Sequence, residues 1–135
     1  MSPKILIDLC KHRLEQAKEN IEEAELLYSA KKFKGANNRA YYSIFHSIKA
    51  VLSLEPIDFK RHKDVIAYFN KNYVHTEIFP KKIGHMIAEA NSIREDSDYD
   101  DEFIVNPEVT IAQINTAKEL LKCVEEYINK TIGNK

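Results

Sequence analysis

The sequence has few of the residues that interrupt helices or build compact catalytic motifs. Its 135 residues include only 3 glycines and 4 prolines, so we expect few turns and long elements. It has no GxxxxGK[ST] or GxGxxG segment for holding phosphates and no nucleophile elbow of the serine hydrolase type. No apolar run approaches the length of a membrane span, and the first residues do not form an apolar export segment. We therefore expect one cytoplasmic domain over residues 1–135, with no membrane association.

Potential metal ligands are equally sparse. The two cysteines, Cys10 and Cys123, lie far apart and are expected to be reduced thiols in the core. The five histidines form no HxxxH or HExxH pair, which gives a zinc site little support. The acidic stretch 96–102 alternates aspartates like a calcium loop, but Asp101 stands where that loop needs glycine and Pro107 where it needs glutamate. The sequence predicts no metal site and no cofactor.

Charge is nearly balanced overall but unevenly distributed. The net charge is −1, which argues against a strongly basic nucleic-acid binder. Residues 31–82 nevertheless contain 11 Lys and Arg against 4 Asp and Glu, whereas the rest of the chain contains 9 against 17. This asymmetry would suit a polyanion on one side of the molecule, although a linear segment of a helical bundle need not form one face.

Apolar residues recur at steps of three and four, the period of amphipathic helices. The expected helices cover residues 3–30, a second stretch starting between 33 and 38 and ending before Pro56, and then 62–74, 80–95 and 107–130. The acidic stretch 96–102 is expected to be a loop, and no convincing strand pattern occurs. The sequence predicts an all-α, up-and-down bundle of about five helices, with the first, second and last side by side.

The second predicted helix has two unlike faces. One face is apolar and should be core: Tyr41, Ile44, Phe45, Ile48, Val51 and Leu52. The other carries Arg39, Ser43, His46 and Ala50. Arg39 and His46 are about two turns apart and point the same way, and the small residues near them would let another surface approach closely. From spacing alone, such a pair is more often solvated or structurally paired than functional.

The tract Arg39-Ala-Tyr-Tyr-Ser-Ile-Phe-His46 resembles the central helix of HEPN domains, whose signature is an arginine followed four to six residues later by a histidine. The resemblance implies a homodimer that places two Arg–His pairs at one cleft and cleaves RNA without metal. Tyr42 and Ser43 would support the pair from the same face. It also implies a toxin neutralised by a minimal nucleotidyltransferase; position 48, where some relatives carry a modified tyrosine, is isoleucine here.

The residue chemistry suits RNA cleavage. A histidine with an ordinary pKa near 6.5 can transfer protons at neutral pH, so His46 would act in proton transfer. Arginine holds a permanent, fork-shaped charge, so Arg39 would contact phosphate. The basic turn Lys60, Arg61 and Lys63 could add RNA phosphate contacts or could simply be solvated. The leading prediction is a HEPN-type ribonuclease; the alternatives are a non-catalytic HEPN module that binds a nucleotide or partner protein, and a structural helical adaptor.

Overall fold

The computed structural model describes residues 3–99 and 106–133, and the regular elements in those ranges are all helical. They are α1 (Pro3–Ser29), α2 (Phe33–Leu52), α3 (His62–Phe69), the π-helix η1 (Asn70–Val74), α4 (Lys81–Tyr99) and α5 (Pro107–Gly133). The predicted all-α bundle of five helices is therefore confirmed. None of the described helices has the length and apolar character needed to cross a membrane.

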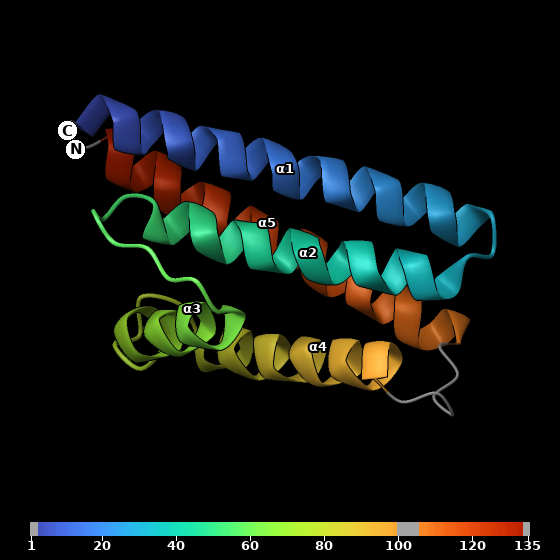
Figure 1. Cartoon of the computed structure of the whole chain (residues 1–135). Coiled ribbons are helices and arrows are strands. Elements are labelled where there is room, and N and C mark those ends of the chain that lie inside the picture. The colour runs from blue at the N-terminus through green and yellow to red at the C-terminus, as the bar shows by residue number, and fades with distance from the viewer. Residues whose placement is uncertain (1–2, 100–105, 134–135) are drawn as a thin grey trace.

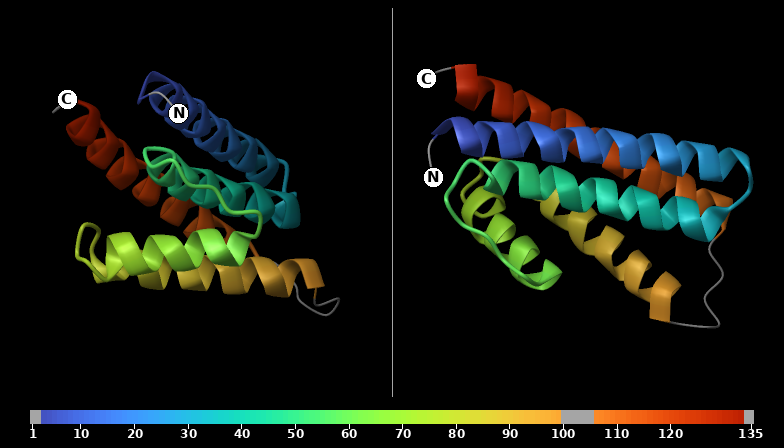
Figure 2. Two further views of the ribbon diagram at one scale, coloured as in Figure 1. Left: turned by 60° about the vertical axis from the view of Figure 1, so that its left-hand side comes forward. Right: turned by 45° about the horizontal axis from the view of Figure 1, so that its top comes forward.

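The helices form two layers (Figure 1). Helices α1, α2 and α5 lie side by side as predicted, with α1 running opposite to the other two. Helices α3 and α4 form the second layer against α2, and the further views show that the described ends of the chain lie at the same end of the bundle (Figure 2). Helix α2 therefore has neighbours from both layers.

The predicted apolar face of α2 is confirmed as core. Its members are at most 7% exposed: Tyr41, Ile44, Phe45, Ile48, Val51 and Leu52. The large side chains pack against apolar residues of α4 and α5 that are also buried, including Ile87, Ile114 and Leu120. Burial of a whole row of such side chains is the main force that fixes α2 in the centre of the bundle.

The small residues of α2 are buried as well, which corrects one expectation. Ser43, Ser47 and Ala50 each have no exposed surface. The Ser43 hydroxyl donates a hydrogen bond of 2.8 Å to the Ala17 carbonyl of α1. Ser43 thus lies directly against α1 of the same chain, and because Ser47 and Ala50 are also fully buried, the small residues are not an open surface for a second subunit.

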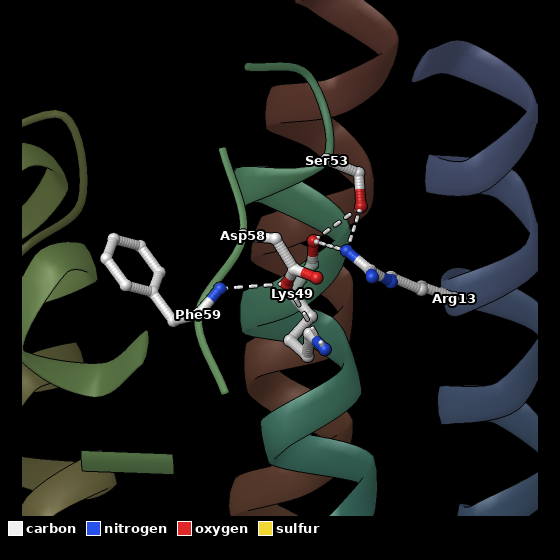
Figure 3. A network of polar contacts seen from close by, with 5 residues as sticks. All are labelled: Arg13, Lys49, Ser53, Asp58 and Phe59. Carbon is white, nitrogen blue, oxygen red and sulfur yellow. Dashed lines mark hydrogen bonds and ion pairs between the residues drawn. The ribbon is translucent and has the colours of Figure 1, made fainter. Parts of the chain in front are cut away.

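A polar network ties the end of α2 to α1 and to the following loop (Figure 3). Arg13 of α1 donates from Nη1 to the Ser53 hydroxyl at 2.7 Å and to the Lys49 carbonyl at 3.3 Å. Both acceptors lie at the C-terminal end of α2, where the Lys49 carbonyl also accepts the Ser53 amide at 2.9 Å, so Arg13 ties α1 to that end of the helix. Lys49 Nζ lies 3.8 Å from Asp58 Oδ1, which in turn accepts a hydrogen bond from the Phe59 amide. The loop after α2 is thereby held beside the helix.

Several boundaries differ from the sequence-based expectation. The third predicted helix is α-helical only to Phe69 and continues as the π-helix Asn70–Val74. Helix α4 continues to Tyr99, so residues 96–99 are helical where a loop was expected. Residues 100–102, the rest of the acidic stretch, lie outside the described residues.

The two cysteines occupy different environments. Cys10 has no exposed surface, and burial raises the pKa of its thiol to about 11, so it is an unreactive core group. Cys123 is only half-buried, which corrects the expectation of a second core thiol. Burial also raises the pKa of Cys123.

Candidate functional site

One stripe of α2 is left partly open to solvent. It is formed by Arg39, Tyr42, His46 and Lys49, at steps of three, four and three residues, and we call it the open stripe. The Arg39 side chain is 45% exposed and that of Lys49 22%. Arg39 and His46 thus lie on the same face, with Tyr42 between them. Ser43, predicted beside them, instead faces α1.

Helix α1 borders one side of the open stripe and links its two candidate residues. His46 Nδ1 lies 2.8 Å from Asn20 Oδ1. The Asn20 amide nitrogen donates to Glu23 Oε1 at 3.0 Å, and Glu23 Oε1 lies 4.0 Å from Arg39 Nε. Arg39, Glu23, Asn20 and His46 therefore form one chain of polar contacts across two helices.

The surroundings of His46 favour a neutral imidazole. Burial lowers the pKa of His46 first, and the positive charges of Lys49 and Arg13 lower it further, with smaller contributions from His62 and His12. A neutral imidazole can accept a proton, as a general base must. The site therefore holds a histidine in the form required for a base, about two turns from an arginine.

His62, the first residue of α3, borders the other side of the open stripe. Its ring stacks on Phe45 with centroids 3.9 Å apart and meets the Tyr42 ring edge-on at 6.1 Å. Its Nδ1 atom is buried and has no hydrogen-bond partner among residues 3–99 and 106–133. Burial is the largest cause that lowers the pKa of His62, followed by the nearby Arg94 and Lys49 charges. Sequence reasoning missed this contact because it weighed the turn around residue 62 only as an RNA-phosphate contact or a solvated turn, not as a packing partner of α2.

The stack of His62 on Phe45 brings the basic turn alongside α2. Lys60, Arg61 and Lys63 are all exposed there. Arg61, the residue before α3, is bound to Asp64 in the first turn of that helix, with Nε 2.9 Å from Oδ2. Lys60 and Lys63 thus extend positive charge beside the open stripe, whereas part of the Arg61 charge is compensated.

The described residues offer no ready metal centre. Across residues 3–99 and 106–133, no group of three or more His, Cys, Asp and Glu side chains is arranged to hold a metal ion. The residues of the open stripe and its borders, chiefly Arg39, His46, Lys49 and His62, instead combine imidazoles with permanent cations. The imidazoles can accept a proton and the cations beside them can attract an anion, so both can act at the same place.

Comparison with known proteins places the chain in a family. The HEPN domain model matches residues 10–131. A protein named "Putative toxin" from Methanocaldococcus jannaschii is 30% identical over 118 residues, which cover 87% of this chain and 76% of that protein. Another protein of that organism with the same description is 35% identical over 86 residues, or 64% of each chain. A UPF0332 protein of Thermotoga maritima is 28% identical over 113 residues, covering 84% of this chain and 86% of the relative. The chain therefore belongs to the HEPN domain family.

Proposed function

We propose that this chain is a metal-independent endoribonuclease that acts as the toxin of a toxin–antitoxin pair, with a minimal nucleotidyltransferase as antitoxin. The observation that carries the enzymatic part is the open stripe. It presents Arg39 and a neutral His46 to solvent on the one face of α2 that neighbouring helices leave partly uncovered. The toxin role is supported by two relatives whose names include the word toxin.

In the proposed reaction, the ribose 2′-hydroxyl is the nucleophile. His46 Nε2 takes the proton from this hydroxyl while the 2′-oxygen forms a bond to phosphorus. The bond from phosphorus to the 5′-oxygen breaks, giving a 2′,3′-cyclic phosphate and a 5′-hydroxyl that gains a proton. Arg39 contacts the phosphate oxygens and stabilises the charge that builds up on them in the transition state. Its ion pair with Glu23 is long and exposed, so an RNA phosphate can displace it.

The leaving 5′-oxygen needs one proton, which His46 of a second copy would donate when the phosphate bound in the cleft keeps that second imidazole protonated. A two-fold axis beside the open stripe would bring two Arg39–His46 pairs together. The buried Ser43 and Ala50 cannot take part in such an interface, so contact would run through the exposed parts of Arg39 and Tyr42. Lys49, Lys60 and Lys63 would then attract RNA to the rim of the cleft.

A non-catalytic HEPN module that binds a nucleotide or a protein is the second candidate. The observation that favours it is that Arg39 and His46 both already have partners within the chain, Glu23 and Asn20. Such a module would bind a nucleotide or an RNA without cleaving it. The two candidates differ in one measurable outcome, the appearance of cleaved products.

The test is RNA cleavage by the purified chain, with defined single-stranded oligonucleotides and EDTA present. We expect products ending in a 2′,3′-cyclic phosphate, and no cleavage of the all-deoxy strand, which lacks the 2′-hydroxyl. His46→Ala should lower the rate by roughly 100-fold or more, the usual scale for losing a general base. Arg39→Lys should stay impaired because lysine lacks the two-pronged contact.

His85→Ala is the matched control, because His85 is an exposed histidine of α4 that borders a hollow lined by Asn70 and Val74 of η1 and makes no contact with the open stripe among the described residues. It should cleave like the unmodified chain. Undiminished cleavage by His46→Ala, or loss of cleavage in EDTA, would refute the assignment. RNA binding without products would favour the non-catalytic module. Sedimentation of the chain at tens of micromolar tests the dimer, and a monomer would refute that part.

A further inference from the structure

Asn20 of α1 is a polar residue that lies directly beside His46. It is half-buried, and both ends of its amide group are engaged. Its nitrogen donates to Glu23 Oε1 at 3.0 Å, and its oxygen lies 2.8 Å from His46 Nδ1. It is thus the residue of α1 that contacts the candidate base directly and joins it to the acidic partner of Arg39.

Glu23 fixes which way the Asn20 amide points. An ionised carboxylate can only accept hydrogen bonds, so the end of Asn20 that faces Glu23 must be the NH₂ group. The amide oxygen must then face His46. Rotating the amide by half a turn would set two oxygens against each other and leave the NH₂ group facing the imidazole. The orientation of Asn20 is therefore a consequence of its neighbour on the next turn of α1.

The Asn20 oxygen in turn decides where the His46 proton resides. An amide oxygen cannot donate, so a hydrogen bond at 2.8 Å requires the imidazole to donate from Nδ1. A neutral imidazole has one N–H, and the hydrogen bond made by one ring nitrogen determines the state of the other. We propose that Asn20 is a positioning residue that holds the neutral His46 ring with its proton on Nδ1, leaving the Nε2 lone pair free to accept the 2′-hydroxyl proton. The catalytic part of this inference rests on the proposed function, but the tautomer itself does not.

Other titratable groups around His46 change how readily the ring is protonated, but they do not determine which ring nitrogen carries the proton of the neutral form. Lys49 of α2, Arg13 and His12 of α1, and His62 of α3 all oppose protonation of the ring. Together with burial, which is the largest cause, they lower the pKa of the ring, so that it is neutral at pH 7, the state in which a tautomer exists. Among the hydrogen bonds of the described residues, the contact with Asn20 is the one made by the His46 ring.

The tautomer can be measured without any enzymatic activity. Two-bond ¹H–¹⁵N correlation spectra of the chain labelled at histidine, recorded near pH 8, distinguish Nδ1–H from Nε2–H for each ring. We expect the Nδ1–H pattern for His46 in the unmodified chain. Asn20→Ala should convert much of the signal to Nε2–H, because nothing then selects Nδ1–H. Glu23→Ala should shift the populations in the same direction, since the amide is then free to rotate.

Two further variants separate positioning from a general structural effect. Asn72→Ala is the matched control, because Asn72 is also a half-buried asparagine that makes a side-chain hydrogen bond, to the Tyr68 carbonyl. It should leave the His46 pattern unchanged. Asn20→Asp keeps an acceptor at the same place and adds negative charge, so it should keep Nδ1–H and raise the pKa of His46. An Nε2–H ring in the unmodified chain, or an unchanged spectrum in Asn20→Ala, would overturn the proposal.

The kinetic consequences follow if RNA is cleaved. Asn20→Ala should lower kcat by about tenfold or more with little change in KM, which is part of the factor of 10² to 10⁴ that a general base contributes. Asn20→Asp should move the acidic limb of the rate–pH profile to higher pH, because the pKa of the base is raised. If the unmodified chain does not cleave RNA, the proposed function fails, while the spectra still decide the role of Asn20 at His46.

Discussion

Phe45→Ala tests both the packing of α2 and the anchor of His62. Phe45 is 7% exposed, and its ring stacks on His62 at a centroid distance of 3.9 Å. It also lies beside Tyr41 at 6.5 Å and 5.7 Å from Lys49 Nζ. Truncation removes all of these contacts and leaves a cavity between α2 and α3.

The expected loss can be worked out from those contacts. Truncating a buried phenylalanine to alanine costs about 3–5 kcal/mol of unfolding free energy. The lysine above the ring adds about 0.5–1 kcal/mol at most, because Lys49 is partly solvated. The total unfolding free energy of a domain of this size is about 5–15 kcal/mol, so the variant should still fold but should melt about 10–20 °C lower than the unmodified chain.

The assay is urea unfolding followed by circular dichroism at 222 nm, since the chain has no tryptophan for fluorescence. Phe33→Ala is the matched control, because Phe33 is half-buried at the first turn of α2 and, within the described part of the chain, has one aromatic contact, an edge contact with Tyr28 at 5.4 Å. It should lose only about 1 kcal/mol. A loss under about 1 kcal/mol for Phe45→Ala would show that the core face of α2 is assigned wrongly.

Three further predictions concern the neighbours of α2. Because burial lowers the pKa values of His46 and His62, the folded state resists protonation, and the unfolding free energy should fall as pH drops below about 6.5. Urea melts at pH 7.5 and 5.5 measure this fall, which should be smaller in His62→Phe than in the unmodified chain. Ser43→Ala removes the hydrogen bond to the Ala17 carbonyl and should cost about 1 kcal/mol in the same melts, so an unchanged midpoint would contradict that contact. Ala50→Arg would bury a charge at a position with no exposed surface and should abolish the native circular dichroism melt, whereas a native melt with a lost dimer would restore the idea of an open small-residue face.

The sequence predicted the helices well because apolar periodicity directly reports burial. The row from Tyr41 to Leu52 identified the core face of α2 without any knowledge of its neighbours. The same periodicity could not tell which helix covers the small residues. Ser43 and Ala50 are compatible with close approach by α1 or by a second subunit, and only the folded chain distinguishes the two.

Only part of the candidate site could be predicted from the sequence. Arg39 and His46 are visible because they share one helix, so their spacing fixes their direction. Asn20 and Glu23 lie on another helix, and their contacts depend on how α1 packs across α2. The stack of His62 on Phe45 depends on the path of the loop between α2 and α3, for which the sequence has no periodic signal.

The helices that shield α2 leave only a narrow strip of it exposed. From Arg39 to Lys49, the open stripe is about 15 Å long at 1.5 Å per residue, and α1 and the start of α3 border it on either side. A strand of RNA crossing it would touch each chain over only a few nucleotides, too few to read a long sequence. Selection among RNAs would then depend on which stretches can be unstacked and bent into the strip, which favours loops and single-stranded ends over duplexes.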